Sequence, residues 1–259
     1  MAGPLRLGRV KHCDPAHTIY LEKLQELLRT SQWEELRREL LSADSALTGG
    51  QLAPAAVLAL QAGLPEQAAS WAQRAGERQL QAAAHLRMGH TEAALPLLQG
   101  ADDHRAEVMR ARAALLAGDP VQAQERAAQA HARAFEAGDA PSLLAAIALL
   151  GELELRGALE SGSRTGLHAA LNVLAEGLKI AEIVNEPADP HVLALIALTQ
   201  HHINSGPKAQ ATAAKALDRS LAFSPAQVLA LTVLGRHEEA QGQAAAGTLA
   251  DAWWTWAQP

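Results

Sequence analysis

The chain has 259 residues and a formal net charge of −6, which argues against the basic surface that a protein needs to neutralise nucleic-acid phosphates. Of these residues 58 are Ala and 41 are Leu, whereas aromatic residues make up only 3%. Ala and Leu favour helices, and strands lack the β-branched and aromatic residues that they prefer. The composition therefore predicts an all-α protein.

Nothing in the composition calls for an oxidising compartment or a membrane. Cys13 is the single cysteine, so no internal disulfide forms. Residues 1–11 lack the apolar run of a signal peptide. The longest apolar stretches, 143–150 and 192–198, are shorter than the roughly 20 residues that span a bilayer. We therefore expect a cytoplasmic protein without membrane contact, in which residues 1–15 form a flexible N-terminus.

Apolar residues at helical spacing, interrupted by Gly and Pro, predict fourteen helices in about seven antiparallel pairs. The expected ranges are 16–30 with 33–44, 51–62 with 65–75, 78–88 with 91–99, 103–117 with 120–137, 141–157 with 165–185, 190–204 with 207–222, and 225–234 with 237–256. The Ser- and Gly-containing stretch 160–166 is expected to be the longest flexible loop. Prolines near 186–190 predict a bend there. No linker separates two bodies, so 16–259 is expected to form one helical repeat domain.

A short motif recurs where these helices are expected to turn. The copies are Gly63–Ala68 (GLPEQA), Gly89–Ala94 (GHTEAA), Gly118–Ala123 (GDPVQA) and Gly235–Ala240 (GRHEEA), with looser copies at Gly206–Ala211 (GPKAQA) and Ser31–Leu36 (SQWEEL). Gly adopts the left-handed conformation that closes a helix, and Pro near the next helix start needs no amide hydrogen. Each copy therefore reads as the hinge of an αα-hairpin.

Small residues at fixed distances from these hinges resemble those of the tetratricopeptide repeat family. They lie seven residues before the turn (Ala56, Ala82, Ala111), five after it (Ala68, Ala94, Ala123, Ala240) and twelve after it (Ala75, Ala101, Ala130, Gly247), and the first unit adds Trp33 and Ala43. The turns are 32, 26 and 29 residues apart, whereas the family repeats every 34 residues or so. The repeats are therefore degenerate. The resemblance implies an α-solenoid, and an irregular helical bundle is the alternative.

In the tetratricopeptide family the first helix of each pair lines a concave binding face. The resemblance places these residues on that face: Gln79, Leu86, Arg105, Val108, Arg112, Leu115, Gln200 and Ile203. The surface is largely apolar with two arginines, which suits an amphipathic helix or hydrophobic peptide that carries an acidic group. The alternative is that these side chains are buried against the next repeat. The paired Lys and Asn residues with which co-chaperones of the family clamp a C-terminal carboxylate are absent.

Trp253, Trp254 and Trp256 form the most unusual local cluster. Tryptophan is enriched among the residues that anchor interfaces, so the cluster could bind a partner or a second copy of the chain. Alternatively, the rings cap the exposed end of the last hairpin, as the terminal repeats of such arrays require.

No metal, cofactor or catalytic constellation is apparent. His12, Cys13, Asp14 and His17 lack the spacing of a closed zinc site. The neighbours His201 and His202, and His191 before them, are expected to be surface residues at the edge of the groove.

The sequence also lacks a nucleophile elbow and a phosphate-binding loop. Glu152 and Glu154 lie two positions apart, so on a helix the two carboxylates point in different directions. We therefore expect no enzymatic activity.

Taken together, these features predict a protein- or peptide-binding adaptor. The alternative is a regulatory sensor that binds a small peptide or metabolite and acts on a separate transcription regulator. Tetratricopeptide-like modules occur in such bacterial regulators, and the Ala- and Leu-rich, Lys-poor usage resembles that of a bacterium with a GC-rich genome.

Overall fold

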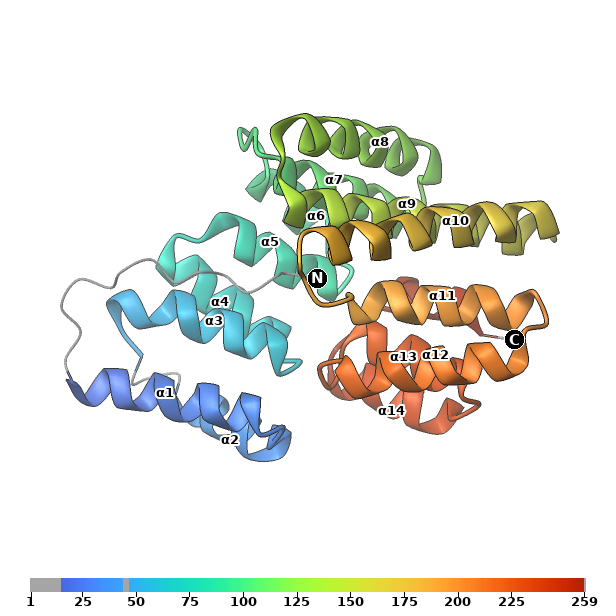
Figure 1. Cartoon of the computed structure of the whole chain (residues 1–259). Coiled ribbons are helices and arrows are strands. Elements are labelled where there is room, and N and C mark those ends of the chain that lie inside the picture. The colour runs from blue at the N-terminus through green and yellow to red at the C-terminus, as the bar shows by residue number, and fades with distance from the viewer. Residues whose placement is uncertain (1–14, 44–46, 259) are drawn as a thin grey trace.

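The computed structural model describes residues 15–43 and 47–258 (Figure 1). The expected flexible arm and the candidate metal ligands His12, Cys13 and Asp14 lie outside the described residues, as does the side chain of His17.

Within the described ranges the chain forms fourteen α-helices and three short 3₁₀ turns, with no β-strand. The α-helices pack in consecutive pairs. The pairs are α1 (Pro15–Arg29) with α2 (Trp33–Ser42), α3 (Leu52–Gln61) with α4 (Pro65–Ala75), α5 (Arg78–Arg87) with α6 (Thr91–Leu97), α7 (His104–Leu116) with α8 (Pro120–Ala137), α9 (Ala140–Ser161) with α10 (Arg164–Ile183), α11 (Pro190–His202) with α12 (Gly206–Arg219), and α13 (Pro225–Val233) with α14 (His237–Ala246). The 3₁₀ turns are η1 (Gly49–Gln51), η2 (Asp251–Trp253) and η3 (Thr255–Ala257). The all-α prediction is confirmed.

Three local predictions are wrong. The last helix was expected to reach residue 256, but α14 ends at Ala246 and the chain continues irregularly. The expected loop at 160–166 is a tight turn, because Ser163 caps α10 by accepting a hydrogen bond from the amide of Gly166. Gly206 begins α12, and Asn204 supplies the left-handed residue of that turn.

The turns inside the helix pairs share one backbone geometry. A residue with positive φ closes the first helix: Ser31, Gly63, Gly89, Gly118, Gly162, Asn204 and Gly235. The next amide then donates to the carbonyl five residues earlier, as Leu64 does to Ala59 and Asp119 to Ala114, both at 2.9 Å. These bonds satisfy carbonyls that a helix end would otherwise leave unpaired, as in the Schellman motif. The hinge prediction from Gly63, Gly89, Gly118 and Gly235 is thus confirmed.

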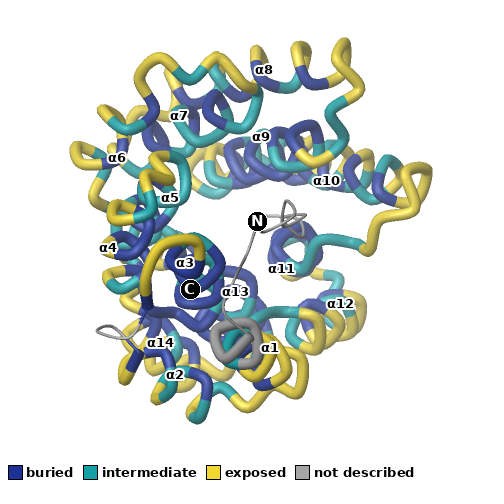
Figure 2. The backbone as a smooth tube through the Cα atoms, turned by 90° about the vertical axis from the view of Figure 1, so that its left-hand side faces the viewer, coloured by how far each residue is buried: buried dark blue, intermediate teal, exposed yellow. Residues whose placement is uncertain are grey.

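The first helices of successive pairs also contact one another, from α1 to α3, α5, α7, α9, α11 and α13. In Figure 2 the helices follow one another around a ring. The last residue of α14 reaches α2, because Arg37 donates to the carbonyl of Ala246 at 2.9 Å. Buried positions concentrate on the helix sides that face neighbouring helices, and exposed positions lie on the outside (Figure 2). Ala is frequent among the fully buried residues, which lets the helix backbones approach closely.

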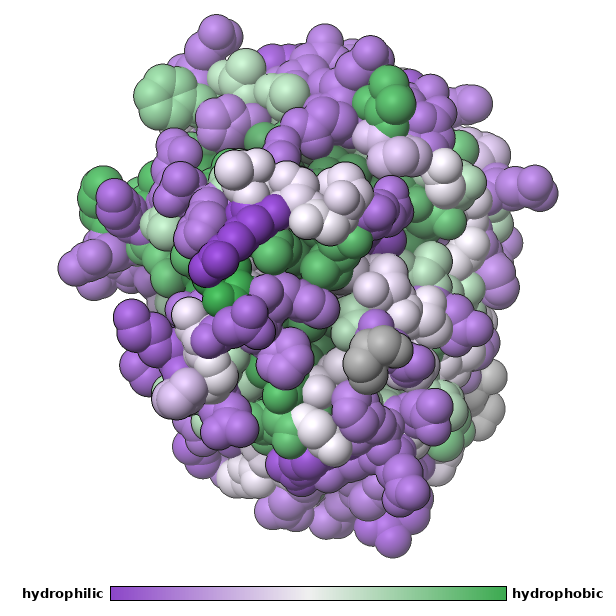
Figure 3. All heavy atoms as spheres, turned by 90° about the vertical axis from the view of Figure 1, so that its right-hand side faces the viewer, coloured by the Kyte–Doolittle hydropathy of each residue, from purple (hydrophilic) through white to green (hydrophobic). Residues whose placement is uncertain are grey.

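The outer surface is mainly polar. Figure 3 shows hydrophilic side chains over most of one face, with hydrophobic ones gathered near its middle. Across the described ranges, no helix combines the length and the apolar character that crossing a membrane requires.

Candidate binding surface

The side of α5, α7 and α9 that meets residues 249–258 is the candidate site. We call this side, with Leu86, Arg87, Arg112 and Arg156, the inner surface, and residues 249–258 the C-terminal segment. Leu86 and Arg87 end α5, Arg112 lies on α7, and Arg156 lies on α9. The segment follows α14, so the chain's last described residues reach helices from its first half.

A buried ionic cluster underlies the inner surface. Glu152 on α9 is fully buried, and its two carboxylate oxygens accept hydrogen bonds from Arg112 Nη1 and Arg156 Nη2, each at 2.6 Å. His191 at the start of α11 is also buried, with its Nε2 3.3 Å from Glu152 Oε2. The cluster therefore connects α7, α9 and α11 through one carboxylate.

The electrostatics of this cluster keep Glu152 ionised. Burial by itself would raise the pKa of the Glu152 carboxyl, because a low-dielectric environment disfavours its charge. The attraction of Arg112, the hydrogen bond with His191 and the attraction of Arg156 outweigh burial and lower that pKa. Two arginines share one carboxylate, so they leave an excess of positive charge at the inner surface.

The C-terminal segment stacks its tryptophans on these arginines. The guanidinium carbon of Arg112 lies 4.6 Å from the ring centroid of Trp253, and that of Arg156 lies 4.4 Å from the ring centroid of Trp256. A guanidinium over an indole face is the most favourable form of cation–π contact. Because Glu152 holds both guanidinium groups, it also fixes the spacing of the two aromatic sites.

Main-chain hydrogen bonds fix the direction of the segment. The amide of Ala250 donates to the carbonyl of Arg87 at 3.1 Å, and Trp253 Nε1 donates to the carbonyl of Leu86 at 3.0 Å. Arg156 Nη2 donates to the carbonyl of Ala252 at 2.8 Å. The segment thus satisfies the carbonyl of Arg87 at the end of α5 and adds a second donor to that of Leu86, which also accepts from the amide of Gly89 at 3.1 Å.

Arg87 is a third, half-buried cation at this place. Its Nη2 donates to the carbonyl of Phe223, between α12 and α13. Burial lowers the pKa of Arg87 to about 10, and within the described residues no ion pair joins it to an acidic group. The inner surface therefore carries a further positive charge beside the tryptophan stacks.

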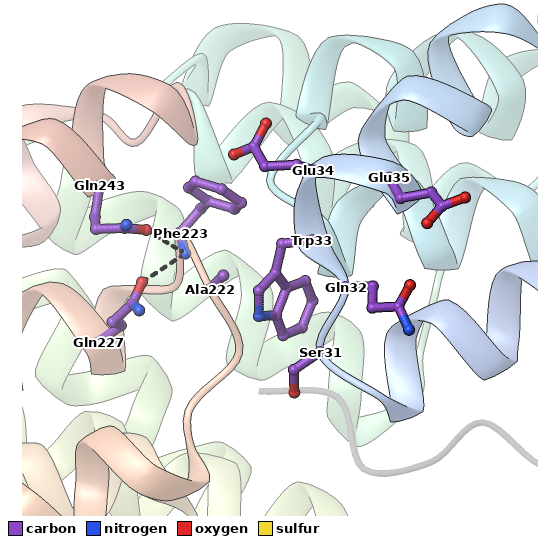
Figure 4. Close-up of a pocket in the computed structure, with 9 residues that line it drawn as sticks. All are labelled: Ser31, Gln32, Trp33, Glu34, Glu35, Ala222, Phe223, Gln227 and Gln243. Carbon is purple, nitrogen blue, oxygen red and sulfur yellow. Dashed lines mark hydrogen bonds between the residues drawn. The ribbon is translucent and has the colours of Figure 1, made fainter.

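Phe223 forms a junction between the first and the last helix pairs (Figure 4). Its φ is +61°, a left-handed conformation, and its amide donates to Gln227 Oε1 at 2.7 Å and to Gln243 Oε1 at 3.2 Å. Arg37 on α2 stacks on the Phe223 ring at 4.4 Å. Its guanidinium also donates to the carbonyls of Ala62 and Ala246 at 3.1 and 2.9 Å. A single side chain from α2 thus joins both ends of the ring.

An open pocket of about 490 Å³ lies beside this junction. Trp33 and Glu34 line it from the start of α2, and Phe223 and Gln227 line it from the opposite side (Figure 4).

The residues expected to line a groove have different positions. Arg105, Val108 and Arg112 lie half-buried on one face of α7, whereas Leu86 and Leu115 are buried. Gln79 donates to Asp103 at the start of α7, Gln200 accepts from Thr212 on its own partner helix α12 at 2.9 Å, and Ile203 packs on the core just beyond α11. Of these residues, Leu86 and Arg112 meet Trp253 of the C-terminal segment, Leu86 through its carbonyl and Arg112 through its guanidinium group.

The tryptophans have two environments. Trp253 and Trp256 are half-buried on the arginines, whereas Trp254 is buried in the hydrophobic core cluster formed around α9 to α14. The expectation that His191 is a surface residue is wrong, because His191 is buried against Glu152. His201 is exposed and His202 is half-buried.

Sequence comparison adds no family to this description: neither protein-family models nor characterised proteins match the chain.

Proposed function

We propose that this chain is a protein- or peptide-binding scaffold of the tetratricopeptide-like type, without catalytic activity of its own. In this proposal the stacked helix pairs form an α-solenoid whose first helices line the concave side. The chain of contacts from α1 to α13 supports that arrangement. So do the family's small positions, because Ala56, Ala68, Ala82, Ala94 and Ala111 are all fully buried.

One observation carries the proposal: the inner surface already holds an irregular segment of chain. It does so with two aromatic stacks and with hydrogen bonds to main-chain groups. Side-chain anchors and main-chain hydrogen bonds are the contacts by which proteins recognise peptide segments. The excess positive charge of Arg87, Arg112 and Arg156 favours a peptide with acidic residues.

A selection from random peptides displayed on phage tests this function with the full chain. We expect enriched peptides that bind at micromolar concentration in calorimetry and that protect α5, α7 and α9 from hydrogen exchange. Arg105 lies two helical turns from Arg112 on the same face of α7, so Arg105→Glu should weaken acidic binders. Arg38→Glu, on the exposed side of α2, is the matched control and should leave them unchanged. Failure to enrich any binder, or binders that protect only the outer helices, would contradict the proposal.

A further inference from the structure

The chain leaves the helical conformation just before the C-terminal segment begins. α14 ends at Ala246, and Thr248 has a φ of +48°, which is uncommon for a residue with a branched Cβ. Gly247 is needed because a Cβ there would lie 2.6 Å from the Cβ of Phe223. Thr248 is exposed, so the segment is joined to the body through a short surface turn.

Leu249, Trp254 and Ala257 of the segment pack in the hydrophobic core cluster, whereas Trp253 and Trp256 make contacts of a different kind. Trp253 and Trp256 lie three residues apart, and each meets one arginine of a pair that Glu152 holds rigidly. Ala250 lies so close to α5 that a Cβ on Gly89 would be 2.8 Å from the Cβ of Ala250. The inner surface thus offers two sites for aromatic rings at a fixed distance from each other. Beside Gly89 it also lets the main chain of a bound segment come close.

The fit of the segment is incomplete. Among the described residues, Arg87 Nε, Arg156 Nε and Trp254 Nε1 are buried without a hydrogen-bond partner. All three atoms are N–H donors, and a buried unpaired donor costs free energy. An occupant that offers acceptor groups to the arginines would therefore bind better than the segment does, and only the tether compensates for the difference.

We infer that the inner surface recognises a segment with two tryptophans three residues apart, and that residues 249–258 occupy it as a tethered ligand until such a segment of a partner protein displaces them. This inference rests on the proposed peptide-binding function and names the chemistry of the peptide. The tethered ligand raises the concentration that a partner needs, so weak or chance binders are excluded.

The experiment cleaves the chain between the C-terminal segment and the rest of the protein. A protease recognition sequence is inserted after Thr248 in the full chain, the protein is folded, and it is then cleaved. We expect the released segment to stay bound on gel filtration and to exchange for a fluorescein-labelled synthetic peptide with the sequence of residues 249–258. The same peptide with Ala in place of Trp253 and Trp256 should bind at least about tenfold more weakly. A peptide with Ala in place of the exposed Thr255 and Gln258 is the matched control and should bind as the unchanged peptide does.

Competition with unrelated peptides tests the partner. Acidic peptides with two tryptophans three residues apart should displace the label, whereas peptides of the same composition with the tryptophans five apart should not. Unfolding on cleavage would show that the segment is structural and would overturn the inference. Equal binding of the Ala-substituted peptide would overturn it too. Dimers of the uncleaved chain that disappear in W253A/W256A would assign the occupant to a second copy and reject a partner protein.

The experiments distinguish failure of the proposed scaffold function from failure of this inference. Phage-selected binders without paired tryptophans would leave the scaffold function standing and remove this inference. A segment that behaves as an exchangeable ligand, in a protein that selects no foreign peptide, would leave this recognition standing and remove the scaffold function.

Discussion

Arg112 on α7 and Glu152 on α9 form a buried ion pair with 2.6 Å between Nη1 and Oε2. The same carboxylate is 2.6 Å from Arg156, which lies one helical turn further along α9. The pair thus connects two helix pairs at the point where the C-terminal segment meets them.

Removing the carboxylate should be strongly destabilising. Glu152→Ala leaves two buried arginines without their counter-charge, and breaking a buried ion pair in this way costs about 3–5 kcal/mol. Glu152→Gln keeps the shape but loses the charge and should cost less. Urea unfolding followed by circular dichroism measures both. Glu154→Gln, half-buried on another face of the same helix, is the control, and an equally large loss there would contradict the role of the cluster.

The pH dependence of stability should contain a component from Glu152. Despite its burial, Arg112, His191 and Arg156 lower the pKa of Glu152 from its ordinary value of 4.5, so the unfolded chain takes up the proton first as the pH falls. This stabilisation is fully present above pH 4.5 or so and is lost progressively as the pH falls below it.

The difference in unfolding free energy between the wild type and Glu152→Gln is the quantity to measure. It should be constant from pH 7 to pH 5.5 or so and should shrink in more acidic solution. A difference that grows with acid would contradict the predicted direction of the shift.

A methyl group at Gly63 should report the contact between the first and last helix pairs. Gly63 has a φ of +70°, and a Cβ there would lie 2.6 Å from the Cβ of Phe223. Gly118 has a φ of +84° with nothing within 4 Å of such a Cβ. Gly118→Ala should therefore cost about 1–2 kcal/mol from backbone strain alone. Gly63→Ala should cost about 1–3 kcal/mol more from overpacking, and equal losses in urea unfolding would argue against the closed ring.

Replacing Arg37 should destabilise the protein far more than replacing its neighbour Arg38. Arg37→Ala removes the stack on Phe223 and the hydrogen bonds to Ala62 and Ala246, and we expect a loss of about 1–3 kcal/mol. Arg38→Ala, at an exposed position, should change stability by no more than about 0.5 kcal/mol. Hydrogen exchange of α14 should accelerate in the first variant only. Unchanged exchange there would contradict the role of Arg37 at the junction.

The helix pairs were predictable from local signals. Gly at the turn, Pro near the start of the next helix and apolar spacing act within a few residues, so the bounds of α4, α5 and α8 follow the sequence closely. The last helix was overestimated because Ala-rich sequence extends past Ala246. Gly247 follows the helix, and Phe223 from the connection between α12 and α13 packs so closely there that a Cβ would not fit.

The site was only partly predictable, because it depends on contacts between distant residues. Arg112 and the tryptophans were identified, but their stacking was not, since nothing in residue spacing brings α7 to residue 253. Glu152 did carry a signal: it stands, with Arg156 four residues later, just after the apolar stretch 143–150 of a helix that is buried on most sides. A charge in such a place requires a partner, and Arg156 is the nearest candidate. The partners Arg112 and His191 come from other helices and leave no trace in the local pattern.

The closing contacts also determine when the fold can be completed during synthesis. Trp253 bonds to Leu86 across 167 positions of sequence, and Arg37 bonds to Ala246 across 209. Each local hairpin can form as soon as its own turn has left the ribosome, but these long-range contacts must wait for almost the whole chain. A nascent chain therefore carries Arg87, Arg112 and Arg156 uncovered until the C-terminal segment has been made. This cationic patch becomes shielded only when residues 249–258 have left the ribosome.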